Sequence, residues 1–147
     1  MKEKEYRGVS TLKKQNDCNK LCSSFQKEVR YSLVRHQSIL DVLSKFQETN
    51  ARTNRAIIKA VTSCGCIQIH AEKQKIPEDI SFSELKEYLD DHLEGQLCQN
   101  CQDIIEDELG KVMFYTSALC ELLNLDFREI LNKELNRIKT LGIYNLR

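Results

Sequence analysis

The chain has 147 residues, of which 41% are apolar and 30% are charged, and its formal net charge is zero. This length and composition are typical of one compact domain with a well-solvated surface. No run of about 18 apolar residues occurs, and the polar N-terminus lacks the apolar segment of a secretory signal, so neither a membrane span nor secretion is expected. We therefore expect a cytoplasmic protein, in whose reducing environment clustered cysteines favour a metal over disulfides.

The charges are divided unevenly along the chain. Residues 1–75 carry 15 Lys and Arg against 7 Asp and Glu, whereas residues 76–147 carry 7 against 15. Either the two halves face each other, within one chain or across a dimer, or the basic half binds phosphate or nucleic acid. The first interpretation is favoured because basic residues on helices usually serve only to solvate a face.

The pattern along the chain favours helices, since only 5 glycines and 1 proline interrupt it. Residues 1–22 are polar and lysine-rich, which predicts a flexible arm before a single helical domain over residues 23–147. A helix can begin with Ser23 or Ser24 as its N-cap. Side chains then recur at helical spacing: Phe25, Val29, Leu33, His36, Leu40, Leu43, Phe46, Ile57, Ile58 and Val61. Residues 24–63 form either one helix or two with a break near Thr49–Asn50, ending in both cases near Cys64.

Three further helices are expected after a connection at residues 66–79 that holds Pro77 and a short extended piece. The first begins with a capping box from Ser81 to Glu84 and ends at Gly95. Its apolar stripe comprises Phe82, Leu85, Leu89 and Leu93. The second is expected from about Gln102 to Leu123. The third begins at a capping box on Asp126 and ends at Gly142, leaving the tail "IYNLR" to dock as an apolar end. Together these elements predict an all-α antiparallel helical bundle with short loops.

The clearest chemical signal is a pair of cysteine motifs, Cys64-x-Cys66 and Cys98-x-x-Cys101. Four thiolates suit the tetrahedral shell of zinc, and Gly65 allows the backbone to bend between the first two. The second pair lies at the start of a predicted helix, whose amides stabilise thiolate charge. We predict a four-cysteine zinc clip that joins helix ends. A shell of four protein ligands leaves no open position, so the metal would be structural.

Other interpretations of the cysteines and histidines stay open. The four thiols could instead be reduced, partly buried cysteines, or the ligands of an iron–sulfur cluster. His70 or His92 could replace one cysteine ligand. Cys18 and Cys22 could form a second half-site, although ordinary thiols are favoured, and Cys120 fits a buried apolar stripe.

Acidic side chains gather on two of the predicted helices. The first group lies on one side of the helix that begins at residue 81, opposite its leucines: Glu84, Glu87, Asp91 and Glu94. The second group lies on the next helix: Asp103, Glu106, Asp107 and Glu108. Carboxylates from two facing helices can hold Mg²⁺ over a phosphate, but a solvated acidic face is the commoner outcome of such runs.

The stretch "EDELGKVMFYTSALCELLNLDFREILNKELNRI" (Glu106 to Ile138) resembles the second half of the MazG-like all-α nucleotide pyrophosphohydrolases. The matching positions are Glu108, Leu109, Gly110, Val112, Phe114, Tyr115, Leu125, Asp126, Lys133 and Asn136. Lys111 stands where the family's Glu-x-x-Asp metal motif has its Asp, and "NRAIIKAVTS" offers no carboxylate for the Glu-x-x-Glu motif. The resemblance thus implies the fold and a homo-oligomer, since MazG-like proteins assemble as dimers or tetramers. The whole chain also resembles an uncharacterised family of small bacterial proteins with "CGC", "LCxxC" and an ending like "TLGIYNL", which implies no function.

Three functions follow from these features. The favoured one is a zinc-binding MazG-like helical protein, non-catalytic or catalytically decayed, that binds a protein partner or a nucleotide. The second is an active Mg²⁺-dependent nucleoside triphosphate pyrophosphohydrolase with a rearranged site formed by Glu87, Asp91, Glu94, Glu108, Lys133, Asn136 and Arg137. The third is a nucleic-acid-binding regulator that uses Arg30, Arg35, Arg52, Arg55 and Lys59, although no aromatic interleaving supports it.

Overall fold

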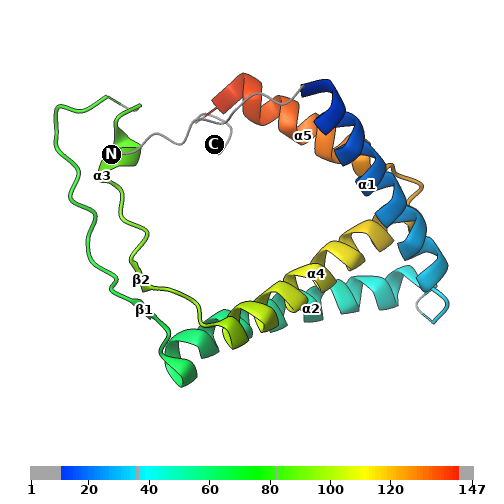
Figure 1. Cartoon of the computed structure of the whole chain (residues 1–147), viewed down its shortest axis with the longest axis horizontal. Coiled ribbons are helices and arrows are strands. Elements are labelled where there is room, and N and C mark those ends of the chain that lie inside the picture. The colour runs from blue at the N-terminus through cyan, green and yellow to red at the C-terminus, as the bar shows by residue number, and fades with distance from the viewer. Residues whose placement is uncertain (1–10, 36, 82, 143–147) are drawn as a thin grey trace. The chain divides into compact units, whose positions relative to one another are not determined.

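The computed structural model describes residues 11–35, 37–81 and 83–142, with side chains from Asp17 onward, and these residues are mostly helical (Figure 1). The helices are α1 (Thr11–Ser32), α2 (Ile39–Lys59), α3 (Leu85–Tyr88), α4 (Gln99–Leu122) and α5 (Phe127–Leu141). A π-helical turn, η1 (Ala60–Cys64), extends α2. Strands β1 (Ile67–Ile69) and β2 (Leu93–Gly95) form an antiparallel two-stranded sheet. Helix is therefore the dominant structure, as expected, but in chain order the two strands of a β-ribbon come between α2 and α4.

The described chain divides into two compact units. The first comprises the residues up to Leu43 and residues 114–142, and the second comprises residues 44–113. Helices α2 and α4 contribute to both units. The expectation of a single helical domain over residues 23–147 stays a prediction.

In the first unit, α1 and α5 lie side by side and run in opposite directions (Figure 1). The core of this unit contains the buried side chains of Val29, Leu33, Val42 and Ala118. Gln26 fastens α1 to the turn between α4 and α5, because its side-chain amide donates to the Leu125 carbonyl oxygen at 2.8 Å and accepts from the backbone N–H of Phe127 at 2.8 Å.

In the second unit, the C-terminal part of α2 and the N-terminal part of α4 are antiparallel. Arg52 of α2 pairs with Glu108 of α4. Ala60, eight residues later at the start of η1, packs near Cys101, which lies seven residues before Glu108 on α4. A small core forms at this end from Ala60, Ile67, Cys101 and Ile105, all less than 9% exposed. The paired cysteines adjoin this core, since Cys101 is a member of it and Cys66 packs against it.

The first helix begins earlier than expected. Helix α1 starts at Thr11 and not at Ser23 or Ser24, so residues 11–22 are helical. The expectation of a flexible arm over residues 1–22 stays a prediction. No glycine or proline occurs between Gly8 and Gly65, and Cys18, Leu21, Phe25 and Val29 continue one stripe at helical spacing. Residues 1–10 lie outside the described residues.

The break in the N-terminal helical region also lies elsewhere. The chain leaves the helix between Ser32 and Ile39, not near Thr49–Asn50, and α2 runs unbroken through that pair. Both side chains bond back to the Phe46 carbonyl oxygen, Thr49 at 2.9 Å and Asn50 at 2.7 Å, which lets polar residues persist inside a helix. The predicted end near Cys64 is confirmed.

The predicted helix from residue 81 to Gly95 is wrong, because only its single turn α3 forms. The Glu84 carboxylate accepts from the Ser81 backbone N–H at 2.9 Å, as a capping box would. Further on, the Asp90 and Asp91 carboxylates accept from the backbone N–H groups of His92 and Leu93, both at 2.9 Å. Such local bonds compete with the helix, and the chain then enters β2.

The two C-terminal helices agree with expectation. Helix α4 spans Gln99–Leu122, and α5 begins after Asp126, whose carboxylate accepts from the Glu129 backbone N–H at 3.1 Å. Gly142 caps the end of α5, while the tail at residues 143–147 lies outside the described residues. No helix within the described residues is long and apolar enough to cross a bilayer.

Candidate metal centre

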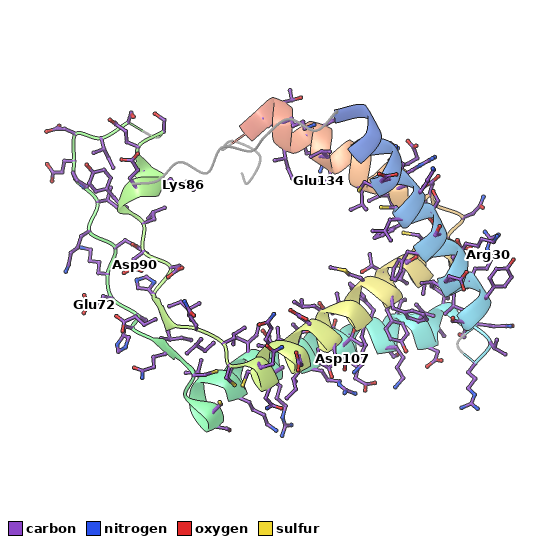
Figure 2. All side chains as sticks on the ribbon, in the orientation of Figure 1. Arg30, Glu72, Lys86, Asp90, Asp107 and Glu134 are labelled. Atoms are coloured by element: carbon purple, nitrogen blue, oxygen red, sulfur yellow. The ribbon has the colours of Figure 1, made fainter. Side chains whose placement is uncertain are left out.

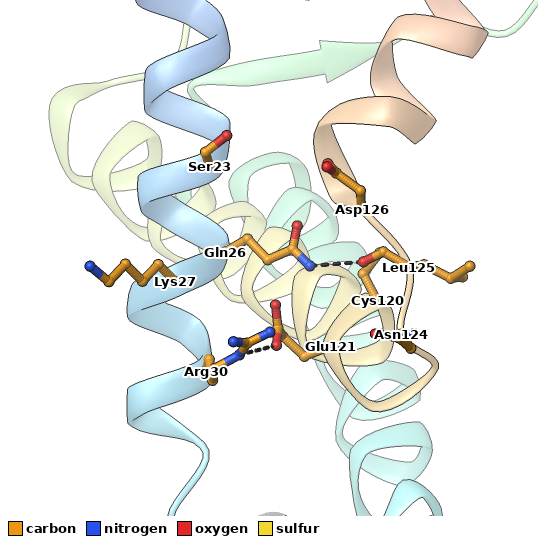
Figure 3. A pocket seen from close by; sticks show the side chains of 9 residues that line it. All are labelled: Ser23, Gln26, Lys27, Arg30, Cys120, Glu121, Asn124, Leu125 and Asp126. Atoms are coloured by element: carbon orange, nitrogen blue, oxygen red, sulfur yellow. Dashed lines mark hydrogen bonds and ion pairs between the residues drawn. The ribbon is translucent and has the colours of Figure 1, made fainter.

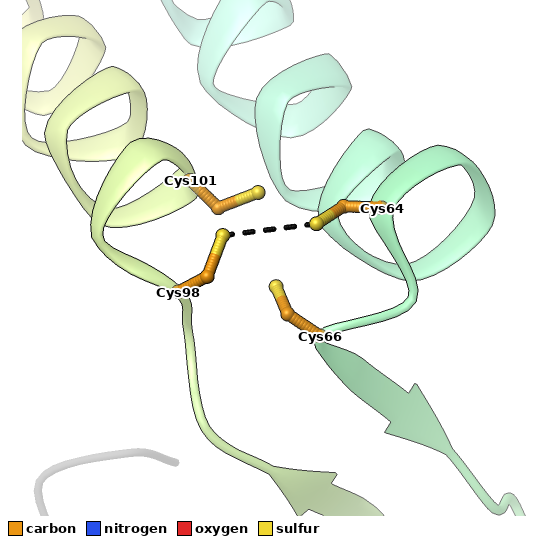
Figure 4. A group of neighbouring side chains, drawn as sticks. All are labelled: Cys64, Cys66, Cys98 and Cys101. Atoms are coloured by element: carbon orange, nitrogen blue, oxygen red, sulfur yellow. Dashed lines mark hydrogen bonds between the residues drawn. The ribbon is translucent and has the colours of Figure 1, made fainter.

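The four predicted cysteines converge at one end of the second unit (Figure 4). Cys64 ends η1 and Cys66 precedes β1, while Cys98 precedes α4 and Cys101 lies in the first turn of that helix. Between the first pair, Gly65 adopts a left-handed conformation (φ 71°), and its N–H donates to the Ala60 carbonyl oxygen at 2.9 Å. This bond closes the wide last turn of the helix and directs the chain into the ribbon.

The β-ribbon brings the two cysteine pairs together. Ile67 lies opposite Gly95 and Ile69 lies opposite Leu93 in the antiparallel register. The chain therefore leaves Cys66 and returns to Cys98 along paired strands, across a separation of 31 residues in sequence. Sequence spacing identified the four thiols, but the ribbon that aligns them was expected only as a short extended piece on one side.

The distances between the thiols fit a single metal ion. All four Sγ atoms lie within 4.8 Å of one another, and the Sγ atoms of Cys64 and Cys98 are 3.7 Å apart. Four sulfurs placed about 2.3 Å from a tetrahedral zinc ion would be about 3.8 Å apart. All four are free cysteines, with no disulfide among them. The group can hold a metal ion without large movement of the backbone.

The surroundings of Cys98 and Cys101 shift the pKa values of these two thiols in opposite directions. The pKa of Cys98 is lowered to about 7, first by the backbone N–H of Cys101 and then by the neighbouring thiols. Burial raises the pKa of Cys101 to about 12, and the thiol of Cys98 adds to this effect. Without a cation, the thiol of Cys98 therefore ionises well before the thiol of Cys101. A divalent cation at their centre would stabilise all four thiolates together.

A close backbone contact fixes the ribbon against the first cysteine pair. Gly95 has a φ of 90°, and a Cβ atom built on it would lie 2.6 Å from the Cys66 carbonyl oxygen. Only glycine permits this approach. The sequence predicts Gly95 as a helix end, whereas in the structure Gly95 lies in β2, in close contact with the loop that carries Cys66.

The other candidate ligands are not members of the cysteine cluster. The His70 ring is 3.5 Å from the Glu94 carboxylate, and the His92 ring lies 2.8 Å from the Glu72 carbonyl oxygen. Cys18 is exposed and Cys22 is half-buried on α1, with the pKa of Cys22 raised by burial and by Cys18. Cys120 is buried, as expected.

The carboxylates proposed for Mg²⁺ do not share a helical face. Glu87 lies in α3, Asp91 lies in the following loop and Glu94 lies in β2. Among the described residues, the only group of three or more potential ligands within metal-binding distance is the cysteine cluster. The geometric premise of the magnesium hypothesis, a shared helical face, is therefore wrong. On α5, Lys133, Asn136 and Arg137 are exposed, and Arg137 pairs with Glu134 at 2.6 Å.

Glu108, the remaining carboxylate of that hypothesis, is already engaged by two cations. It is only 6% exposed, and its Oε1 accepts from Arg52 at 2.7 Å and from Lys111 at 3.1 Å. Arg52 lowers the pKa of Glu108 most, with Lys111 contributing. The spacing of Glu108 and Lys111 was visible in the sequence, but the contribution of Arg52 from another helix was not.

Two of the basic side chains suggested for nucleic acid are engaged in ion pairs. Arg30 pairs with Glu121 at 2.5 Å and Arg52 pairs with Glu108, so two of the five guanidinium and ammonium groups hold helices together. The Arg30–Glu121 pair borders an open groove of about 350 Å³ between α1 and the α4–α5 turn (Figure 3). This groove contains charges of both signs and so has no strong preference for an anion.

Comparison with protein families, curated proteins and solved structures finds no match to this chain.

Proposed function

We propose that this protein is a zinc-binding helical protein whose metal is structural and which acts by binding rather than by catalysis. The observation that carries the proposal is the convergence of four thiols within 4.8 Å of one another. Zinc is favoured over an iron–sulfur cluster because the thiolates of a cluster must surround several irons and sulfides, whereas these four sulfurs are spaced for one ion.

The metal would link the end of η1, the β-ribbon and the start of α4, which few other interactions hold together. The core next to the site contains four buried side chains, one of which is the ligand Cys101, and β1 and β2 are three residues each. A two-stranded ribbon of this size is marginal in water. A shell of Cys64, Cys66, Cys98 and Cys101 would leave no position for a substrate, so the ion would stabilise the helix ends and the ribbon.

The MazG-like resemblance would then apply to the helices and not to the reaction. In this proposal Glu108 keeps the position of a family metal ligand, but Lys111 replaces the second carboxylate and Arg52 neutralises the first. Two cations beside a carboxylate oppose the binding of Mg²⁺. The protein would therefore act in the cytoplasm as a non-catalytic homo-oligomer that binds a protein partner or a nucleotide.

The apolar pocket of about 210 Å³ beside the metal centre supports a binding role. It is lined by Ala56, Ala60 and Ile104 together with Cys64 and Cys101. Lys59 and Asn100 also line this pocket and supply polar groups. A small apolar side chain of a partner would fit there, and loss of the metal would disturb the pocket because it shares two ligands.

The deciding experiment is elemental analysis of protein purified without added metal, compared with Cys98→Ser/Cys101→Ser. We expect about one zinc ion per parent chain and none in the variant. Free zinc at a thousand times its dissociation constant adds about 4 kcal/mol to stability, so zinc loss should lower the Tm by roughly 8–16 °C. The matched control, Cys18→Ser/Cys22→Ser, removes two thiols outside the cluster and should keep the zinc.

Two results would contradict the proposal. If the parent protein is purified without a bound transition metal, zinc has no structural role. Mg²⁺-dependent release of pyrophosphate from a nucleoside triphosphate would show an active enzyme, whatever the zinc content.

A further inference from the structure

The segment of residues 76–94, here called the acidic extension, has no core of its own. It carries seven acidic residues and one lysine. Apart from Phe82, which the structure does not describe, not one of its residues is buried. Four large apolar side chains are 45–49% exposed: Ile76, Tyr88, Leu89 and Leu93. Figure 2 shows Lys86 and Asp90 projecting from this segment. An ordered acidic segment with this much apolar surface fits a docking element.

The pair of helices α1 and α5, here called the basic arm, has the opposite charge. The two helices together carry nine basic and four acidic residues. Helix α5 has no buried residue. Its apolar side chains are 42–50% exposed and lie on one face: Ile130, Leu131, Leu135, Ile138 and Leu141. Lys133 and Lys139 flank this face on either side, as the 3.6-residue helical repeat places them.

The charges of the acidic extension and the basic arm indicate how these two surfaces can pair between copies of the chain. Two basic arms from different copies would repel each other, and so would two acidic extensions. An acidic extension on a basic arm would pair opposite charges around apolar side chains from both surfaces. That arrangement is the usual anatomy of a specific interface, with an apolar centre and a polar rim.

We propose that the acidic extension of one copy of this chain docks on the basic arm of a second copy, and that the reciprocal contact closes a two-fold symmetric dimer. Each chain supplies one extension and one arm, so the two reciprocal contacts cover both surfaces of both chains. No surface then stays open to bind a third copy. Two equivalent contacts of about 600–1,000 Å² each would reach the area of a stable interface. The docking rests on the homo-oligomer of the proposed function, but it requires neither the metal nor a nucleotide.

Charge reversal tests the pairing without touching the cysteines. Lys133→Glu/Lys139→Glu reverses the arm, and Glu78→Lys/Glu87→Lys reverses the extension at exposed positions. By sedimentation equilibrium we expect the parent to be a dimer and each variant to dissociate at least about tenfold more readily. In an equimolar mixture both contacts become complementary again, so the two variants should form a heterodimer, detected by native mass spectrometry.

The control for net charge is Arg35→Glu/Arg55→Glu, which makes the same change outside the proposed contact and should keep the dimer. A monomeric parent at about 100 µM would overturn the proposal. So would variants that dimerise like the parent, or a mixture that fails to form the heterodimer. Zinc content measured on the same samples should be unchanged, which separates failure of the docking from failure of the metal centre.

Discussion

Gly95 offers the sharpest test of how the ribbon supports the metal centre. In Gly95→Ala, the new Cβ would lie 2.6 Å from the Cys66 carbonyl oxygen, and the residue would keep a φ of 90°. An unfavourable φ costs about 1–2 kcal/mol and a forced contact in packed structure about 1–3 kcal/mol. The expected loss is roughly 3 kcal/mol, or a fall in Tm of about 6–12 °C. Because Cys66 must shift, zinc affinity should fall as well.

Substitutions at two other glycines separate the effect of the unfavourable φ from that of the close contact on the stability lost in Gly95→Ala. Gly65 has a φ of 71° but open space around its Cβ position, so Gly65→Ala should cost only about 1 kcal/mol. Gly110 has no close neighbour and lies inside α4, so Gly110→Ala should stabilise by about 0.5–1 kcal/mol. Thermal unfolding and zinc competition with a chelator would rank the three variants. Equal behaviour of Gly95→Ala and Gly110→Ala would refute the reasoning.

Three further predictions concern the helices. Val42→Ala removes two methyl groups from a fully buried side chain and should cost roughly 2 kcal/mol in denaturant unfolding, with m unchanged. Asp126→Ala should cost about 1 kcal/mol through loss of the cap on Glu129, whereas Asp126→Asn should cost little. Because Arg52 lowers the pKa of Glu108 in the folded state, its stabilisation is present above the unfolded-state pKa and disappears as pH falls through the folded value. Unfolding followed from about pH 6 to about pH 3 should therefore show a shallower loss for Glu108→Gln, and parallel curves would contradict this sign.

Predictions from the sequence were accurate wherever one local rule decided the structure. The end of the helical region near Cys64, the cap on Asp126 and the end of α5 at Gly142 each follow from glycine or from a side chain that bonds its own backbone. The four clustered cysteines followed from their spacing, because two close pairs already supply half a tetrahedral shell each.

The predictions failed where two local signals competed. A capping box and a leucine stripe predicted a long helix after Ser81, but the bonds made by Asp90 and Asp91 and the pairing with β1 ended it after one turn. Helical periodicity alone does not reveal this early helix end. An apolar stripe recurs at helical spacing whether or not another element is present for the stripe to pack against. Helix α1 starts at Thr11 despite the polar composition of residues 11–22, because no glycine or proline interrupts them.

The sequence by itself thus determined the helical class, the helix ends marked by glycine and aspartate, and the four thiols available to a metal. Only the tertiary structure decided that a β-ribbon aligns those thiols and that Arg52 reaches Glu108 from another helix. It also decided that the proposed magnesium ligands are distributed over a turn, a loop and a strand. The physical reason is that caps and turns depend on neighbours within four residues, whereas strand pairing and ion pairs depend on residues brought together across the chain.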